Sequence, residues 1–277
     1  MKSCPIVLIV IAHTVVDELP FGQSSRQYGY NHCIQVLSSK QGGYAYLAKI
    51  TATLQFLQTA SYHPNQLYIL MDAFDTYFRH GPHELVQRFR HTGKRVVISS
   101  EINFIHQPGE WKPYFDNLST QESRYLNSGV VMGYGDMLRM LLEYSANSSL
   151  LKLASKRGTD QASISDAIVH HGFSKFNGSL DYKQRIAYTA SAKRWSLKLS
   201  NEDIAKYDPV IVHFPFTAAP RVNRTFYASY DGHRGDAWPE ADYNFCRDQE
   251  KACSLDHNGP YCHIGGGHRP GMNRLAC

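Results

Sequence analysis

Short apolar runs rich in β-branched residues alternate along this chain with longer segments of helical periodicity. Turn residues bound the apolar runs, which predict strands at residues 5–12, 33–37, 67–71, 95–100 and 209–213. Apolar residues recur at helical spacing between them, in residues 44–60, 83–91, 135–146 and 161–171. This alternation predicts an α/β fold in which helices cover a mostly parallel sheet on both faces.

The periodic pattern stops near residue 227, beyond which Gly, Pro, Asn, Asp, His and Cys dominate. The chain has 277 residues, 43% hydrophobic and 19% charged, which is enough for one large α/β domain with a buried core. We therefore predict one domain over residues 1–226, followed by an irregular, disulfide-linked extension over residues 227–277.

Four of the six cysteines lie in the predicted extension: Cys246, Cys253, Cys262 and Cys277. They allow three pairings, among which the sequence does not choose. Their spacing lacks the CxxC pairs of a structural zinc site, although nearby histidines leave a metal site as the alternative. Disulfides, together with four Asn-X-Ser/Thr glycosylation patterns, favour a location in the lumen of the secretory pathway.

The net charge of +5 mildly favours an anionic ligand, such as a diphosphate, a nucleic acid or a membrane surface. The basic residues are scattered, without the run that is typical of a nucleic-acid-binding tail. The longest apolar run, residues 5–12, is far shorter than the ~20 residues of a membrane helix, so we predict no membrane span. No small-residue cleavage site follows it, and we interpret it as a buried first strand rather than a signal peptide.

Two aspartates follow the predicted strand at residues 67–71. In parallel sheets the ligand crevice lies at the carboxyl ends of the strands, which places Asp72 and Asp75 at its edge. Three residues apart across a tight turn, both carboxylates can face one hard cation such as Mg²⁺ or Mn²⁺, which would stabilise a diphosphate leaving group. The alternative is that Asp72 caps the turn and Asp75 is solvated.

His213 ends the predicted strand at residues 209–213 and is expected at the same edge of the sheet. The alternative is a hydrogen-bonded histidine in the core.

Several segments occur in the order found in one protein family: LYILMDAFDTYF, SSEINF, YLNSGVVMGY, GTDQASISDAIV and PVIVHFPF. They resemble the collagen-modifying glycosyltransferases, which comprise procollagen galactosyltransferases, the glycosyltransferase domain of procollagen lysyl hydroxylases, and viral and microbial relatives. The resemblance covers residues 5–216 and implies a GT-A-like, Rossmann-like fold. It implies transfer of glucose or galactose from UDP-glucose or UDP-galactose to a hydroxyl on a protein or glycan, including hydroxylysine or a hydroxylysine-linked sugar.

The resemblance also implies a Mn²⁺ or Mg²⁺ site formed by Asp72, Asp75 and His213. The chain departs from the family directly after His213, where residues 214–216 are Phe, Pro and Phe in place of small Gly and Asn residues.

The resemblance makes Glu101 a candidate for orienting the donor or the acceptor, and Asn127 a candidate for positioning the donor. It implies that Asn127, Ser128 and Gly129 turn the backbone close to the sugar, where a glycine permits close approach of a ligand. The alternative is a plain turn before a buried strand.

On the acceptor side, Asp160 matches a family acid at a helix start. A carboxylate there can accept the proton of the acceptor hydroxyl or stabilise positive charge on the sugar. The alternative is an N-cap aspartate. Asp181, in LDYKQRI, matches another family acid and is expected either on the acceptor side or behind the residues that contact the ligand.

Lys49 matches a family lysine near the diphosphate, where its charge would act on the departing oxygens. The alternative is an ordinary solvated helix lysine. Thr14, after the first predicted strand, matches the segment that holds the nucleoside.

Two other functions are possible besides an enzyme of this kind. The first is a non-catalytic accessory module that binds a sugar nucleotide. The second, transfer to a hydroxymethylated DNA base, is supported only by the positive charge.

Overall fold

The computed structural model describes residues 5–11, 20–37, 45–59, 62–72, 75–148, 159–190, 201–213, 253–256 and 259–262. The chain divides into two compact units, Met1–Phe214 and Pro215–Cys277. The predicted domain boundary between residues 226 and 227 lies outside the described residues. Among the described helices, none has the length and apolar character needed to cross a bilayer.

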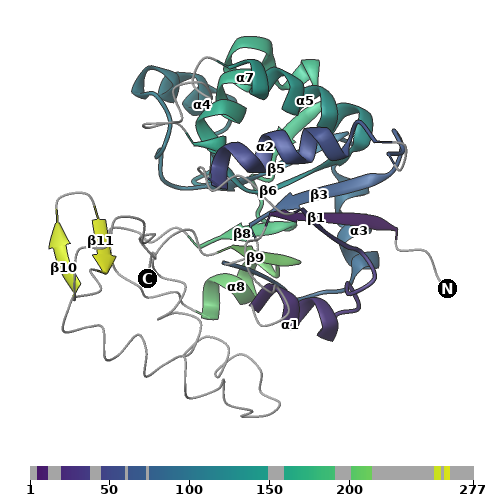
Figure 1. The fold of residues 1–277 in the computed structure, drawn as a ribbon. Helices are drawn as coiled ribbons and strands as arrows, with labels where there is room; N and C mark the ends of the chain where they lie inside the picture. Colours follow the sequence, from purple (N-terminus) through teal and green to yellow (C-terminus); the bar gives the residue numbers. More distant parts are fainter. Residues whose placement is uncertain are drawn as a thin grey trace, which may run out of the picture. The chain divides into compact units, whose positions relative to one another are not determined.

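A nine-stranded sheet forms the centre of the first unit (Figure 1). Its strands are β1 (Ile6–Ile11), β2 (Ile34–Leu37), β3 (Leu67–Met71), β4 (Thr76–Phe78), β5 (Val96–Glu101), β6 (Tyr125–Tyr134), β7 (Gly178–Leu180), β8 (Ala187–Thr189) and β9 (Ile211–His213). Their order is β2-β1-β3-β6-β5-β8-β9-β4, and β7 also pairs with β5. Only β6 and β4 run antiparallel to their neighbours, so the mostly parallel sheet is confirmed.

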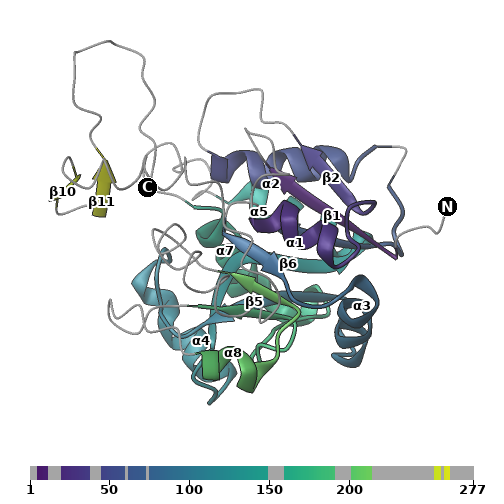
Figure 2. The ribbon, with the colours of Figure 1, turned by 90° about the horizontal axis from the view of Figure 1, so that it is seen from below.

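Helices cover both faces of this sheet. One face carries α2 (Ala45–Phe56), α4 (Lys112–Leu118), α5 (Gly135–Asn147) and α7 (Asp160–Lys175), and the other carries α1 (Pro20–Gln27) and α3 (Pro82–His91). Figure 2 shows the unit from the side of α1 and α3. Alternate residues of β3 enter the two cores: Ile69 packs with the α1 and α3 side chains, and Leu70 packs with those of α2, α5 and α7. Burial on both faces explains why these strands read as unbroken apolar runs.

A short connection forces the sheet to curl. β3 ends at Met71 and β4 begins at Thr76, yet β4 lies five strand positions away from β3 in the sheet order. In a flat sheet five positions span roughly 24 Å, whereas the connecting residues reach about 18 Å at most. The sheet must therefore bend until its β9–β4 edge approaches the end of β3.

Each predicted strand and helix contains or overlaps an observed one. Several elements were not predicted: α1, α4, the short strands β4, β7 and β8, helix α8 (Asn201–Tyr207), and the long strand β6. In the second unit, β10 (Cys253–Asp256) and β11 (Gly259–Cys262) form an antiparallel pair whose register sets Cys253 opposite Cys262. The cysteine pairing in this unit remains a prediction.

The loop before β9 is fastened to α3 by Arg88. Its Nε lies 2.6 Å from Glu84 Oε1, its Nη2 lies 3.0 Å from Asp208 Oδ2, and its Nη1 donates to the backbone oxygens of Asp208 and Arg185. Asp208 has a positive φ of 45° and also binds His80 Nε2 at 2.9 Å. Burial alone would raise the pKa of Asp208, but the hydrogen bonds from His80 and Arg88 lower it. These contacts hold the loop that leads into β9, the strand that ends at His213.

We expect Arg88→Met to lower the free energy of unfolding by about 1–3 kcal/mol, because it leaves several partly buried oxygen acceptors without their donor. Denaturant unfolding followed by circular dichroism measures the change. Arg90→Met, on the same helix but exposed, serves as the control and should change stability by less than about 0.5 kcal/mol. Equal effects of the two substitutions would contradict the anchoring role.

Candidate functional site

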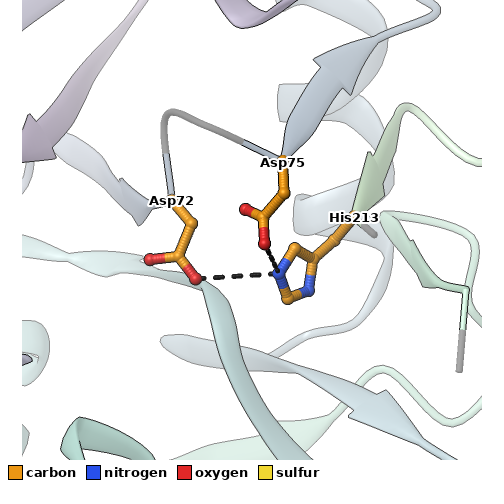
Figure 3. Close-up of side chains that lie close together, drawn as sticks. All are labelled: Asp72, Asp75 and His213. Carbon is orange, nitrogen blue, oxygen red and sulfur yellow. Dashed lines mark ion pairs between the residues drawn. The ribbon is translucent and has the colours of Figure 1, made fainter. Parts of the chain in front are cut away.

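The structure brings Asp72, Asp75 and His213 together. Asp72 directly follows β3, Asp75 directly precedes β4, and His213 ends β9, where it pairs with Thr76. His213 Nε2 lies 3.6 Å from Asp72 Oδ2 and 3.4 Å from Asp75 Oδ2. Figure 3 shows both carboxylates directed at the imidazole. The convergence follows from the curled sheet, which brings β9 next to the end of β3.

The three side chains fit a divalent cation. Two ligands about 2.1 Å from one ion at an angle of roughly 110° are about 3.4 Å apart, close to the observed separations. Neither ring nitrogen of His213 has a hydrogen-bond partner although the residue is 2% exposed, and Asp75 Oδ1 is also buried without one. Buried polar atoms normally have hydrogen-bond partners, and atoms that bind a metal ion are one exception. Within the described part of the chain, this is the one cluster of at least three His, Cys, Asp or Glu side chains that can hold a metal ion.

These contacts also decide between the earlier alternatives. His213 is not a hydrogen-bonded core histidine, because neither ring nitrogen forms a hydrogen bond and Nε2 instead faces the two carboxylates. The Asp72 carboxylate binds Lys49. Burial alone would lower the pKa of His213, but the neighbouring Asp75 and Asp72 carboxylates raise it.

Gly129 of β6 makes room for the imidazole. A Cβ atom at this position would lie 2.0 Å from Cε1 and 2.3 Å from Nδ1 of His213. The Gly129 carbonyl also accepts a hydrogen bond from the Asp72 backbone amide at 3.0 Å. Gly129 therefore contacts two of the three candidate ligands, and only a glycine leaves enough space for His213.

This arrangement corrects the sequence interpretation of Asn127, Ser128 and Gly129. They lie within the continuous strand β6 and do not form a turn. β6 pairs with β3 through residues 130–134, and its ladder with β5 is interrupted between the pairs Ile98–Val131 and Ser100–Leu126. Asn127, Ser128 and Gly129 therefore form an irregular, bulged stretch of the strand. The open side of Gly129 faces His213.

Lys49 lies beneath the acid pair. Its Nζ is 2.7 Å from Asp72 Oδ1, 2.7 Å from the Ser128 carbonyl oxygen and 2.9 Å from Asp160 Oδ2. The residue is 5% exposed, so the alternative of a solvated helix lysine is wrong. Burial alone would lower the pKa of Lys49, but Asp160 and Asp72 raise it and keep the ammonium charged.

Asp160 is the first residue of α7 and not its N-cap. The cap is Thr159, whose Oγ1 accepts a hydrogen bond from the Ala162 amide at 3.1 Å. Asp160 is 3% exposed, and its carboxylate pairs with Lys49. The Lys49 ammonium group therefore lies between the carboxylates of Asp160 and Asp72 and contacts both.

Glu101 and Asn127 form a buried network that sequence reasoning did not predict. Glu101 Oε1 accepts from Asn127 Nδ2 and from Gln161 Nε2, each at 3.2 Å. Asn127 Oδ1 in turn accepts from the Gly129 amide at 2.9 Å, and Gln161 Oε1 accepts from the Ser128 amide at 3.2 Å. These side chains hold the backbone of β6 that supports the site. Gln161 was not among the predicted site residues, although it follows Asp160 in the helix-start motif.

Asp181 binds backbone. Its Oδ2 accepts from the amides of Ile186 at 2.7 Å and Ala187 at 2.9 Å, and its Oδ1 accepts from Arg185 at 3.2 Å. Burial raises the pKa of Asp181, while these three hydrogen bonds oppose the shift. The carboxylate closes the loop between β7 and β8, and its contacts do not place it at the cluster of Asp72, Asp75 and His213. Thr14 lies outside the described residues.

Comparison with known proteins gives a match to one family. The model described as the PLOD GT domain matches residues 7–150, more than half of the chain. No curated protein sequence gives a significant match.

Three solved structures are among those similar to this chain. Mouse xyloside xylosyltransferase 1 in its apo form shares 14% identity at a TM-score of 0.42, over 76% of this chain and 98% of that one. A glycosyltransferase involved in glycosylation of the major capsid of PBCV-1 shares 11% identity at a TM-score of 0.47, over 80% of this chain and 99% of that one. The apo WbbM bifunctional glycosyltransferase shares 10% identity at a TM-score of 0.48, over 79% of this chain and 47% of that one.

We expect Gly129→Ala to lower the Mn²⁺ affinity of the protein by about tenfold or more, because the added methyl group displaces the His213 ring. Titration with Mn²⁺ followed by electron paramagnetic resonance measures this affinity. Gly109→Ala is the matched control, since a Cβ there has no atom within 4 Å. An unchanged Mn²⁺ affinity in a folded Gly129→Ala protein would show that His213 is not a ligand.

Proposed function

Since the chain belongs to the family of PLOD glycosyltransferase domains and has a GT-A-like α/β fold, we propose that it transfers glucose or galactose from a UDP-sugar to a hydroxyl acceptor. The observation that carries this proposal is the convergence of Asp72, Asp75 and His213 on one point at the edge of the sheet. A sugar nucleotide presents a diphosphate leaving group, and a cation-binding cluster of this composition suits that chemistry.

Asp72 Oδ2, a carboxylate oxygen of Asp75 and His213 Nε2 would hold Mn²⁺ or Mg²⁺. The ion would offset the negative charge that develops on the departing diphosphate. Two hard oxygen ligands favour either ion, and an imidazole ligand favours Mn²⁺ over Mg²⁺. His213 is held against Gly129 and is nearly inaccessible to water, so it would meet the ion without a large rearrangement.

Asp160 would serve the acceptor. Its carboxylate would accept a hydrogen bond, or the proton, from the attacking hydroxyl, or stabilise charge that develops on the sugar. The ion pair with Lys49 supports this role, because it holds the buried carboxylate close to the proposed cation site. Asn127 would act on the donor through the Gly129 amide, and Glu101 would orient the side chains of Asn127 and Gln161, which bind the amides of Gly129 and Ser128. Thr14 would contact the nucleoside.

The acceptor that we propose is a protein or a glycan, with hydroxylysine or a hydroxylysine-linked sugar as the first to test. The lumen of the secretory pathway remains our proposal for its location. A disulfide bond at Cys33 supports this proposal, since disulfides persist in oxidising compartments.

We expect chelation with EDTA to reduce UDP release from UDP-glucose or UDP-galactose to background, and added Mn²⁺ to restore it. Asp75→Asn should lower the rate by about 100-fold, because the neutral amide is a weaker ligand. The measurement is a coupled assay for UDP, run with and without a hydroxylysine peptide. Glu110→Gln, the same acid-to-amide change at an exposed position, is the control and should leave the rate within about twofold.

Full activity in a metal-free sample would reject the proposed metal centre. Tight binding of a UDP-sugar without any turnover would instead identify a non-catalytic binding module. Transfer to hydroxymethylated DNA in preference to peptides would reject the proposed acceptor while leaving the metal centre intact.

A further inference from the structure

The ammonium group of Lys49 joins four separate parts of the fold. Lys49 projects from α2, and its three acceptors belong to the end of β3, to the middle of β6 and to the start of α7. All three distances lie between 2.7 and 2.9 Å, in the range of strong charge-assisted contacts. The side chain is 6% exposed, so water does not compete for these contacts.

Protein groups surround the ammonium. It donates hydrogen bonds to Asp72 Oδ1 and to the Ser128 carbonyl oxygen, and it forms an ion pair with Asp160 Oδ2 at 2.9 Å. A diphosphate oxygen would have to displace one of these acceptors in order to bind Lys49 directly. In the structure, the lysine therefore binds protein groups and not a free anion.

The contacts divide the two oxygens of Asp72 between different partners. Oδ1 lies 2.7 Å from Lys49, whereas Oδ2 is directed at His213. With Oδ1 bound to the lysine, Oδ2 is the oxygen that Asp72 directs at the cluster. Asp160 is likewise held by the lysine, which keeps this third carboxylate from joining Asp72 and Asp75 around the ion.

Charge supports the same conclusion. Asp72, Asp75 and Asp160 carry three negative charges within this part of the molecule, and Lys49 supplies the opposing charge that contacts two of them. A carboxylate buried as deeply as Asp160, at 3% exposure, requires such a partner.

We propose that Lys49 is a positioning residue that limits Asp72 to one metal-binding oxygen and reserves Asp160 for the acceptor side of the site. The role of Asp160 rests on the function proposed above. The effect on the cation does not depend on glycosyl transfer, and it can be measured on the protein alone.

The test is the Mn²⁺ affinity of the full chain without nucleotide, measured by electron paramagnetic resonance. Lys49→Met should tighten Mn²⁺ binding by about tenfold, because a unit positive charge roughly 5 Å from a divalent ion is removed and Asp160 is released. Loss of structure cannot tighten metal binding, so this direction separates positioning from a general folding defect. In the same variant kcat should fall while the KM for the UDP-sugar changes by less than about threefold.

Two further variants keep the test decisive if Lys49→Met does not fold. Asp160→Asn should weaken Mn²⁺ binding several-fold, since it removes a negative charge and leaves Lys49 in place. The double variant Lys49→Met with Asp160→Asn should return to within about threefold of the original affinity, because one charge of each sign is lost. Lys94→Met, an exposed lysine between α3 and β5, is the matched control and should have no effect.

Two results in folded Lys49→Met would together overturn the proposal: Mn²⁺ binding that is unchanged or weaker, and a raised KM for the UDP-sugar with kcat unchanged. They would make Lys49 a ligand of the diphosphate. An unchanged affinity in Asp160→Asn would overturn it as well. Absence of Mn²⁺ binding by the unaltered chain would reject the metal centre and this role together, whereas Mn²⁺ binding that ignores both substitutions would reject only the role of Lys49.

Discussion

The short connection between β3 and β4 is the constraint on which the rest of the site depends. It joins strands at distant positions of the sheet order, so the sheet has to curl until its far edge meets the end of β3. Asp72 and Asp75 lie at the two ends of this connection, and His213 lies on β9, the strand that pairs with β4. The same short segment therefore supplies both acids and determines which histidine they meet.

The buried charges in this region form one connected unit. The imidazole rests on Gly129, the Gly129 carbonyl binds the Asp72 amide, and the Asp72 carboxylate binds Lys49. Lys49 also forms an ion pair with Asp160 at the start of α7. Because unpaired charges are costly in a protein interior, each of these groups depends on its neighbour, and a change at one position is expected to be felt at the others.

Sequence patterns identified the parts of this arrangement that depend on local order. The five buried residues of β3 and the acids after it could be predicted because burial on both faces gives an unbroken apolar run. β6 was misinterpreted at Asn127–Gly129, since the ladders on either side of this irregular stretch, and not a local pattern, decide that the segment belongs to a strand. Strands of three residues, such as β4 and β8, are too short to show periodicity. The partners of Lys49 come from distant segments, and no local pattern encodes them.

The position of His213 near the end of the described first unit has a consequence for biosynthesis. While the chain emerges from the ribosome, Asp72 and Asp75 are made early, and the imidazole that completes their cluster is added only after nearly all of that unit has been translated. Until β9 docks, the two acids lack their partner, and a nascent chain that stops before this strand has no complete cation site. Cation binding by the cluster therefore requires that β9, the last strand of this unit, has paired with its neighbours in the sheet.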